Sequence, residues 1–200
     1  MGVESLKYRG SVSKDGALIL KKGVYYDDLL KPELHDSLQE KNGFGLYLSF
    51  MTSDQQQGDG VIFSYGKDEK DFNFKFESRG NDIYLVTRQY LNKKPVIREQ
   101  KLLTAKKELY RLFVSYRPGK LQVFRHTKKV VEFDDYSGLM ENWLTLPFSF
   151  GDHLKGTHKY WSGSIYNFAL FSAFVDERRM AEIISLLNRK FEKPGKRFKR

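Results

Sequence analysis

The sequence predicts an all-β fold, a two-sheet antiparallel jelly-roll sandwich with a short C-terminal helix. Aromatic residues make up 15% of the 200 residues, and many of them fall in short apolar or alternating segments. About ten such segments recur along the chain with Gly, Pro, Asn or Asp between them, a spacing typical of β-sandwiches. No internal repeat or linker divides the body, and 200 residues are enough to bury the core of one domain.

The first strong strand signals lie between residues 44 and 65. Residues 44–51 are apolar almost throughout, which predicts a strand that is buried on both faces. Residues 61–65 follow a polar loop and predict the next strand. Ahead of both, residues 29–38 predict a helical turn that contains Pro32.

Residues 71–88 predict a β-hairpin. In its first arm, three phenylalanines alternate with polar residues and predict a half-buried strand, with Phe72, Phe74 and Phe76 opposite Asn73, Lys75 and Glu77. Residues 79–82 supply the turn, since Gly and Asn accept positive φ. On the returning arm, one face holds Ile83, Leu85 and Thr87, and the other holds Tyr84, Val86 and Arg88.

Five further strands and one helix complete the prediction. The strands are expected at residues 109–116, 121–126, 129–133, 146–150 and 164–171. A Pro118-Gly119 turn joins the first two of them into a second hairpin. Asp176 can cap a helix over residues 177–187, whose apolar side chains recur at helical spacing on one face.

The positive charge of the chain is concentrated at its C-terminal end. The formal net charge is +10, and residues 189–200 alone hold seven basic residues and one acidic residue. The sequence therefore predicts a sandwich domain over residues 1–188 and a basic, flexible tail over residues 189–200. The tail could contact an anionic polymer. The body is only mildly basic, which argues against nucleic acid as its ligand.

Composition excludes several kinds of site and segment. Cysteine is absent, which excludes a disulfide framework, a thiolate zinc site and a cysteine nucleophile. No apolar run approaches the ~18–20 residues of a membrane-spanning helix, and residues 1–7 lack the pattern of a signal peptide. Four basic residues lie on predicted strands, and strand order decides whether they share one face for nucleic acid: Lys75, Arg88, Arg111 and Arg125.

Residues 161–171, Trp-Ser-Gly-Ser-Ile-Tyr-Asn-Phe-Ala-Leu-Phe, resemble a motif of the concanavalin A-like lectin/glucanase superfamily. In its laminin-G-like, pentraxin-like branch, a Trp-x-Gly-x-Ile segment leads into the last strand and a short helix follows. Further matches come in the family's order at residues 63–65, 73–76, 80–88, 112–116, 121–132 and 148–152. One departure is Arg125-His126-Thr127, which stands where the family usually has Asp-Gly. The resemblance covers roughly residues 16–187.

The resemblance implies a jelly-roll sandwich and favours an extracellular or cell-surface location, but it does not imply one activity. The superfamily contains lectins, carbohydrate-binding modules, glycosidases, polysaccharide lyases and protein-binding modules. Its glycosidases place three acidic residues on one strand face, whereas Glu132 and Asp134 are followed here by Tyr136 and Ser137. The four histidines form no lyase motif. The main hypothesis is a non-catalytic, lectin-like carbohydrate-binding module, and the alternatives are a glycoside hydrolase or polysaccharide lyase and a protein-interaction sandwich.

Six residues are candidates for contact with a carbohydrate. Sugar binding needs aromatic faces for the pyranose ring and polar groups for its hydroxyls. The candidates are Tyr84, Arg88, Trp143, His153, His158 and Tyr160. The first two share a strand face that could carry an acidic or sulfated glycan, and the last three belong to a hydrophilic loop. Trp143, like Trp161, also falls where the family keeps a framework tryptophan, so a core position is its alternative.

The resemblance also raises calcium as a cofactor, because relatives often hold this ion through loop oxygens. The candidate ligands are Asn81, Asp82 and Asp152, with Asp134 and Asp135 as further oxygen donors. The acidic spacing of a high-affinity calcium loop is missing, and each of these residues is also a common turn former. A zinc site at His153 and His158 is excluded because no further ligands lie at suitable spacing.

Overall fold

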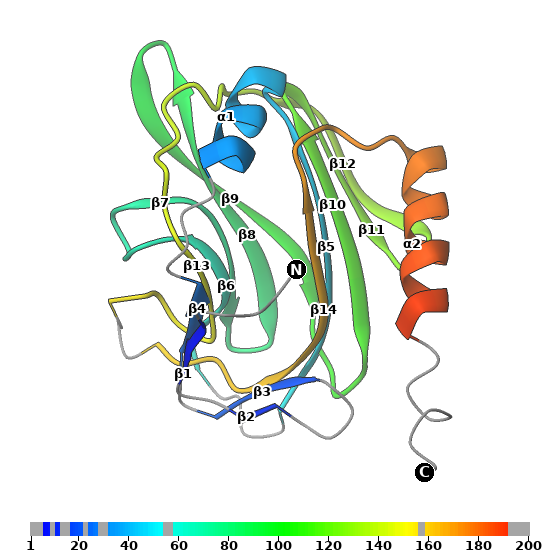
Figure 1. Cartoon of the computed structure of the whole chain (residues 1–200). Helices are drawn as coiled ribbons and strands as arrows, with labels where there is room; N and C mark the ends of the chain where they lie inside the picture. The colour runs from blue at the N-terminus through cyan, green and yellow to red at the C-terminus, as the bar shows by residue number, and fades with distance from the viewer. Residues whose placement is uncertain are drawn as a thin grey trace.

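The computed structural model shows two antiparallel sheets packed face to face, with one helix at an end of the sandwich and one on an outer face (Figure 1). It describes residues 6–8, 11–12, 17–21, 24–27, 32–53, 58–155 and 159–191. The predicted all-β jelly-roll sandwich with a C-terminal helix is confirmed. Within the described ranges, no helix combines the length and the hydropathy that crossing a lipid bilayer requires.

Each sheet contains seven strands within the described residues. Sheet A has the spatial order β1 (Leu6–Tyr8), β4 (Tyr25–Asp27), β13 (Phe148–Phe150), β6 (Gly60–Gly66), β7 (Phe72–Arg79), β8 (Asp82–Leu91) and β9 (Lys94–Thr104). Sheet B has the order β12 (Lys128–Tyr136), β11 (Gly119–Arg125), β10 (Tyr110–Arg117), β5 (Phe44–Thr52), β14 (Gly163–Phe171), β3 (Leu18–Leu20) and β2 (Ser11–Val12). The helices are α1 (Pro32–Lys41) and α2 (Glu177–Phe191).

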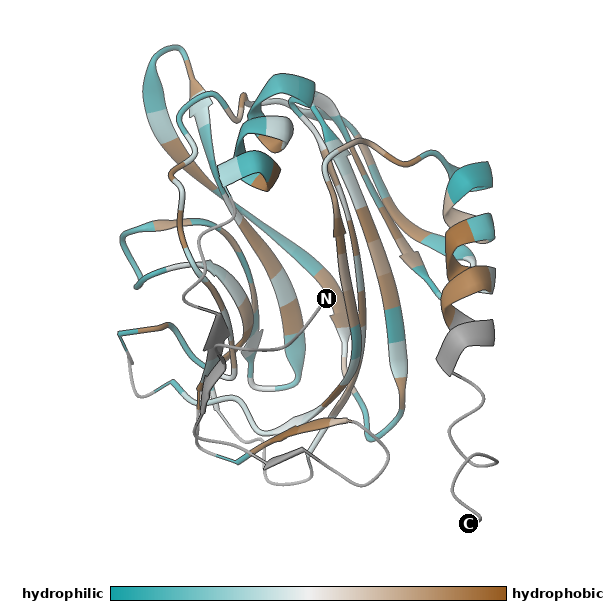
Figure 2. Cartoon of the chain, viewed as in Figure 1, coloured by the Kyte–Doolittle hydropathy of each residue, from teal (hydrophilic) through white to brown (hydrophobic). Residues whose placement is uncertain are grey.

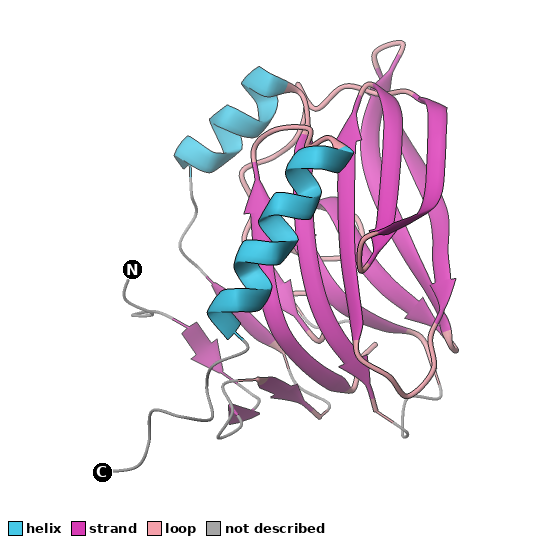
Figure 3. Ribbon diagram, turned by 90° about the vertical axis from the view of Figure 1, so that its right-hand side faces the viewer, coloured by secondary structure: helices cyan, strands magenta, loops and turns pink. Residues whose placement is uncertain are grey.

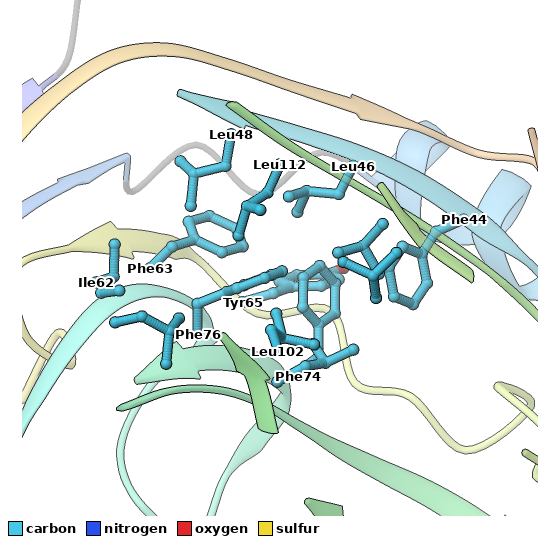
Figure 4. Packing of buried hydrophobic residues seen from close by; sticks show 14 of the residues in the cluster. Phe44, Leu46, Leu48, Ile62, Phe63, Tyr65, Phe74, Phe76, Leu102 and Leu112 are labelled. Carbon is cyan, nitrogen blue, oxygen red and sulfur yellow. The ribbon is translucent and has the colours of Figure 1, made fainter. Parts of the chain in front are cut away.

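The space between the sheets is filled by aromatic and aliphatic side chains. Phe44 of β5 stacks on Phe74 of β7 across this space, with ring centroids 4.7 Å apart. Figure 4 shows the leucines of sheet B above the aromatic residues of sheet A, namely Leu46, Leu48 and Leu112 above Phe63, Tyr65 and Phe76. Burial of apolar surface stabilises a fold by about 25 cal/mol per Å², so this cluster holds the two sheets together.

The Trp161-Ser162-Gly163 motif acts through packing. Trp161 is fully buried and meets Phe50 edge-on, with ring centroids 6.1 Å apart. A Cβ atom at Gly163 would collide with the indole ring of Trp161. Glycine is therefore the residue that lets the ring lie over the start of β14, which is a structural reason for the motif on which the family resemblance rests.

Helix α2 covers the outer face of sheet B (Figures 1 and 3). Its apolar side faces the strands, as Figure 2 shows. The buried cluster between helix and sheet contains Tyr47, Phe113, Phe124, Val175, Met180 and Ile184. The predicted cap is present, because the carboxylate of Asp176 accepts the backbone N–H of Arg179 at 2.8 Å. The helix continues to Phe191, and residues 192–200 of the predicted tail lie outside the described residues.

Strand β9 is an element that the sequence pattern does not predict. It pairs with β8 across a two-residue turn, in which Asn92 and Lys93 have φ values of 50° and 61°. As the edge strand of sheet A, it exposes many of its side chains and consists largely of charged and polar residues. Apolar residues in a regular pattern were the signal that identified the other long strands. An exposed edge strand does not need this pattern, so β9 was not recognised. The short strands β1 to β4 lack the same signal.

The alternation predicted for β7 holds for Phe74 and Phe76, which enter the core cluster, but not for Phe72, which lies on the outer face beside Lys75. A register irregularity in the pairing of β7 with β6 accompanies this change of face. Asn73 is 1% exposed and Lys75 is 8% exposed. The amide of Asn73 donates to the carbonyl oxygen of Leu144 at 2.6 Å and accepts the N–H of Leu144 at 2.9 Å. Asn73 is therefore held by the segment that contains Leu144, whereas Lys75 and Glu77 lie on the outer face of sheet A.

Candidate functional site

A groove of about 520 Å³ lies on the outer face of sheet A. Its floor is formed by β7 and β8, and β9 bounds one side of it. The turn between β6 and β7 and Lys159 bound the other side. This volume lies within the range of about 300–1,000 Å³ that is typical of small-ligand sites.

The lining of the groove combines charged and apolar side chains. Its acidic residues are Asp59, Glu69, Glu77 and Glu99, and its basic residues are Lys70, Lys75, Arg79 and Lys159. Apolar contacts are offered by Val61, Phe72, Val86 and Ile97. Ile97 is 51% exposed, which makes it an accessible apolar surface in the groove.

Arg79 connects two carboxylates at one end of the groove. Its Nε–H donates to Glu77 at 2.7 Å, and its Nη1 and Nη2 groups donate to the two carboxylate oxygens of Glu99 at 2.7 Å each. This is the two-pronged geometry that arginine forms with carboxylates. The guanidinium also lies 4.6 Å from the ring centre of Tyr84. The hydrogen bond from Arg79 lowers the pKa of Glu99, so Glu99 is ionised at neutral pH.

Two lysines form ion pairs with acidic residues of the groove. The Nζ of Lys75 lies 2.7 Å from a carboxylate oxygen of Glu77 and 5.1 Å from the ring centre of Phe72. Lys159 pairs with Glu69 at 2.8 Å and thereby lowers the pKa of that carboxyl. The second pair joins the segment after residue 158 to the β6–β7 turn, so it shapes the wall of the groove.

Beside the groove, His153 is buried between its loop and sheet A. Its Nδ1 lies 3.2 Å from the hydroxyl oxygen of Ser64 on β6, and its side chain is 0% exposed. The carboxylate of Asp152 accepts the backbone N–H of His153 at 2.7 Å. Burial, with a further contribution from the charge of Lys75, lowers the pKa of His153 to about 4. His153 is therefore neutral at pH 7 and packs against the sheet instead of facing a ligand.

The other predicted carbohydrate residues are distributed over several places. Tyr84 lies under Arg79 at the end of the groove, on the same face as the groove residue Val86. Arg88 follows on that face but does not line the groove, and its Nη1 has no partner among the described residues. Tyr160 is half-buried and forms a bridge with the backbone of Val61. His158 lies outside the described residues.

Trp143 occupies the framework position that was its alternative interpretation. It is 4% exposed and packs on Phe74, with ring centroids 5.5 Å apart. Its Nε1–H donates to the carbonyl oxygen of Arg88 at 2.7 Å. The indole is therefore satisfied inside the core, and no face of it is presented to a sugar in this structure.

The three predicted calcium ligands do not converge. Asn81 and Asp82 form the turn between β7 and β8, where Asp82 pairs with Lys101 at 2.8 Å and accepts the hydroxyl of Thr104 at 2.6 Å. Asp152 lies after β13, at the other side of β6 and β7. Across the part of the chain that the structure describes, no three His, Asp or Glu side chains gather as metal ligands. Calcium binding stays a prediction.

The four basic strand residues do not form one face. Lys75 and Arg88 belong to sheet A, whereas Arg111 and Arg125 belong to sheet B. Arg125 is moreover paired with Glu108 at 2.6 Å. These four residues therefore do not form one basic stripe.

The acidic residue that came closest to a glycosidase pattern is held in its ionised form. Glu132 lies on β12, the edge strand of sheet B, and pairs with Lys129 at 2.6 Å and Lys120 at 3.0 Å. These contacts, together with a hydrogen bond from Gln122, lower its pKa to about 2. A glycosidase acid needs a raised pKa, and neither Glu132 nor Glu99 in the groove meets this requirement.

Sequence reasoning missed several groove residues. Glu99 and Ile97 come from β9, which was not predicted, and Glu69 and Lys159 lie in connecting segments. One usable signal was present, namely the alternation of charged residues on the polar face of β7. Such a row of charged residues, on a strand whose opposite face is apolar, indicates an outer sheet surface. It does not indicate which other strands complete a site.

No family model and no curated protein matches the sequence. The fold is nevertheless shared with solved structures. The binding domain of botulinum neurotoxin serotype D/C VPI 5993 matches with a TM-score of 0.66 at 9% identity, over 90% of this chain and 45% of that chain. A structure of botulinum neurotoxin type C, a toxin whose cell entry depends on two ganglioside molecules, matches with a TM-score of 0.64 at 9% identity. This match covers 92% of this chain and 45% of that chain.

A third match is the binding domain of botulinum neurotoxin DC in complex with rat synaptotagmin II, with a TM-score of 0.62 at 8% identity. It covers 92% of this chain and 45% of that chain. The chain thus spans less than half the length of these structures. At such low identity the comparison shows the sandwich fold alone, because unrelated functions are built on one fold.

Proposed function

We propose that this chain is a non-catalytic binding module that holds a glycan in the groove on sheet A. The observation that carries the proposal is the groove itself, which combines the exposed apolar side chain of Ile97 with ordered hydrogen-bonding groups. A pyranose ring has an apolar face and a rim of hydroxyl groups, so it requires both kinds of contact. Ile97 would meet the ring, and the carboxylates of Glu77 and Glu99 would accept hydrogen bonds from hydroxyl groups.

The comparisons support a binding role in a general way. Two of the matched structures are named as binding domains, one of them in complex with a synaptotagmin, and the third is named for a toxin whose cell entry depends on gangliosides. Membership of the concanavalin A-like, laminin-G-like group is part of the same proposal and rests on the sequence motifs alone. Calcium as a cofactor and contact of the basic tail with an anionic polymer belong to the proposal as well.

A glycan array tests the proposed function directly. The wild-type chain should bind a subset of glycans, and Ile97→Asp should lose at least about tenfold in affinity because a charge would replace an apolar contact. Leu186→Asp is the matched control, since Leu186 is 63% exposed on α2 at the other side of the sandwich. Arrays run with calcium and with a chelator decide whether the ion is required. Absence of binding to any glycan would reject the proposal.

A protein partner is the second candidate function. Strand β9 is an eleven-residue edge whose second neighbour is missing among the described strands, and it borders the groove. Edge strands can add a strand from another protein through backbone hydrogen bonds. Pro95 and the charged residues of β9 oppose such pairing at several positions, which places this function second.

A further inference from the structure

The charges in the groove are balanced, in contrast to those of the whole chain. The groove is lined by four acidic and four basic residues, while the chain carries a formal net charge of +10. The positive excess therefore lies elsewhere on the molecule. A site that attracts anionic ligands would be expected to hold a surplus of cations.

Most of the basic groups in the groove already bind carboxylates of the groove. Lys75 pairs with Glu77, Lys159 pairs with Glu69, and Arg79 binds Glu77 and Glu99 together. The three N–H donors that Arg79 directs at these carboxylates are those that an incoming sulfate or uronate would need. Lys75 is 8% exposed, so its ammonium has little surface left for a new anionic partner.

We infer that the groove binds an uncharged glycan, one without sulfate, phosphate or carboxylate groups. The inference rests on the proposed function and names the class of ligand. An anionic ligand that binds Arg79 would have to displace Glu77 or Glu99, and the released carboxylate would then lie beside a like charge. A hydroxyl group can instead add to the existing pairs, because an ionised carboxylate has about four acceptor positions and each pair uses only part of them.

Besides Lys70, which lines the groove, Arg88 offers an alternative place for an anionic group. It lies on the outer face of β8 opposite Ile97, and its Nη1 is buried without a hydrogen-bond partner among the described residues. However, Arg88 does not line the groove. A glycan held through Arg88 would thus occupy a different position, and substitution of Arg88 separates the two cases.

Affinity electrophoresis of the full chain tests the inference. The gels contain a neutral polysaccharide (dextran, mannan, galactan or β-glucan) or an anionic one (dextran sulfate, heparin or polygalacturonate). We expect retardation by at least one neutral polymer, with an affinity that changes less than about twofold between 50 and 500 mM NaCl, since no counterions are released. Glu99→Gln should weaken this binding about fivefold to tenfold, because a charged acceptor becomes a neutral one.

Glu182→Gln is the matched control, because Glu182 is also paired with an arginine and its side chain is 47% exposed, against 45% for Glu99. The control and Arg88→Met should both leave binding to the neutral polymer unchanged. Retardation by anionic polymers alone would overturn the inference, and so would a gain of affinity in Glu99→Gln or a loss in Arg88→Met. If no polysaccharide retards the chain, the proposed function fails together with the inference.

Discussion

The outer faces of the two sheets differ in what covers them. Sheet B carries an apolar outer face that helix α2 buries through Met180 and Ile184. Sheet A carries ion-paired side chains on β7 to β9 and leaves a groove above them. The chain therefore covers the outer face of sheet B with its own helix and leaves the groove on the outer face of sheet A uncovered. The proposed ligand site accordingly lies on the face that helix α2 does not cover.

The largest effect is expected where the covered face is opened. Met180 is fully buried between α2 and sheet B, so Met180→Ala should lower the free energy of unfolding by about 2–5 kcal/mol. Urea denaturation measures this loss. Leu186→Ala, at a 63% exposed position of the same helix, should stay within about 0.5 kcal/mol. Equal stability of both variants would show that α2 is not part of the cooperative unit.

The second effect concerns the buried histidine beside the groove. Burial lowers the pKa of His153 to about 4 from its ordinary value of 6.5, so the unfolded chain binds the proton more readily than the folded one. Stability should therefore fall as the pH drops from 6.5 towards 4, by about 2–3 kcal/mol in total. Denaturation curves between pH 7 and pH 4 measure the slope.

His153→Gln should remove most of that slope. A part should remain, because burial also lowers the pKa of His35, whose Nδ1 lies 3.0 Å from the hydroxyl of Tyr65 on the other side of sheet A. If the pH dependence of stability is unchanged in His153→Gln, protonation of His153 does not contribute to it. The loop over β6 would then leave the ring accessible to water in the folded protein, and the site beside the groove would be less rigid than the covered face.

A smaller effect is expected for the groove arginine. Arg79→Lys keeps the charge but loses the paired hydrogen bonds to Glu99, so the free energy of unfolding should fall by about 1 kcal/mol. The loss should shrink in 1 M NaCl, since the pair is partly exposed. Arg178→Lys, at a 93% exposed side chain of α2, is the control. A loss of more than about 3 kcal/mol in the free energy of unfolding would show that Arg79 mainly stabilises the fold.

The smallest effect is expected for the basic tail. Removal of residues 192–200 should leave the Tm of the sandwich nearly unchanged, because helix α2 and its buried contacts end before them. Differential scanning calorimetry of the full and the shortened chain gives the comparison. A marked drop in Tm would show that the tail packs on the outer face of sheet A or sheet B.

The fold could be predicted from the sequence wherever burial dictates residue type. Phe74 and Phe76 identify β7 because their face of that strand enters the core, whereas Phe72 lies on the outer face in spite of the same sequence pattern. Strand β9 shows the limit of this reasoning, since an exposed edge accepts Lys, Arg and Glu without a pattern. The groove depends on the meeting of Arg79 with Glu99 across β8, and such a meeting follows from strand order and register, which no local pattern contains.

The buried positions of the two tryptophans have a spectroscopic consequence. Trp161 is 0% exposed and Trp143 is 4% exposed, and neither lines the groove. The intrinsic fluorescence of the native protein should therefore be blue-shifted and should move to longer wavelength only when the sandwich unfolds. A glycan that occupies the groove should leave this emission almost unchanged. Any strong quenching by a ligand would report that the core itself has moved.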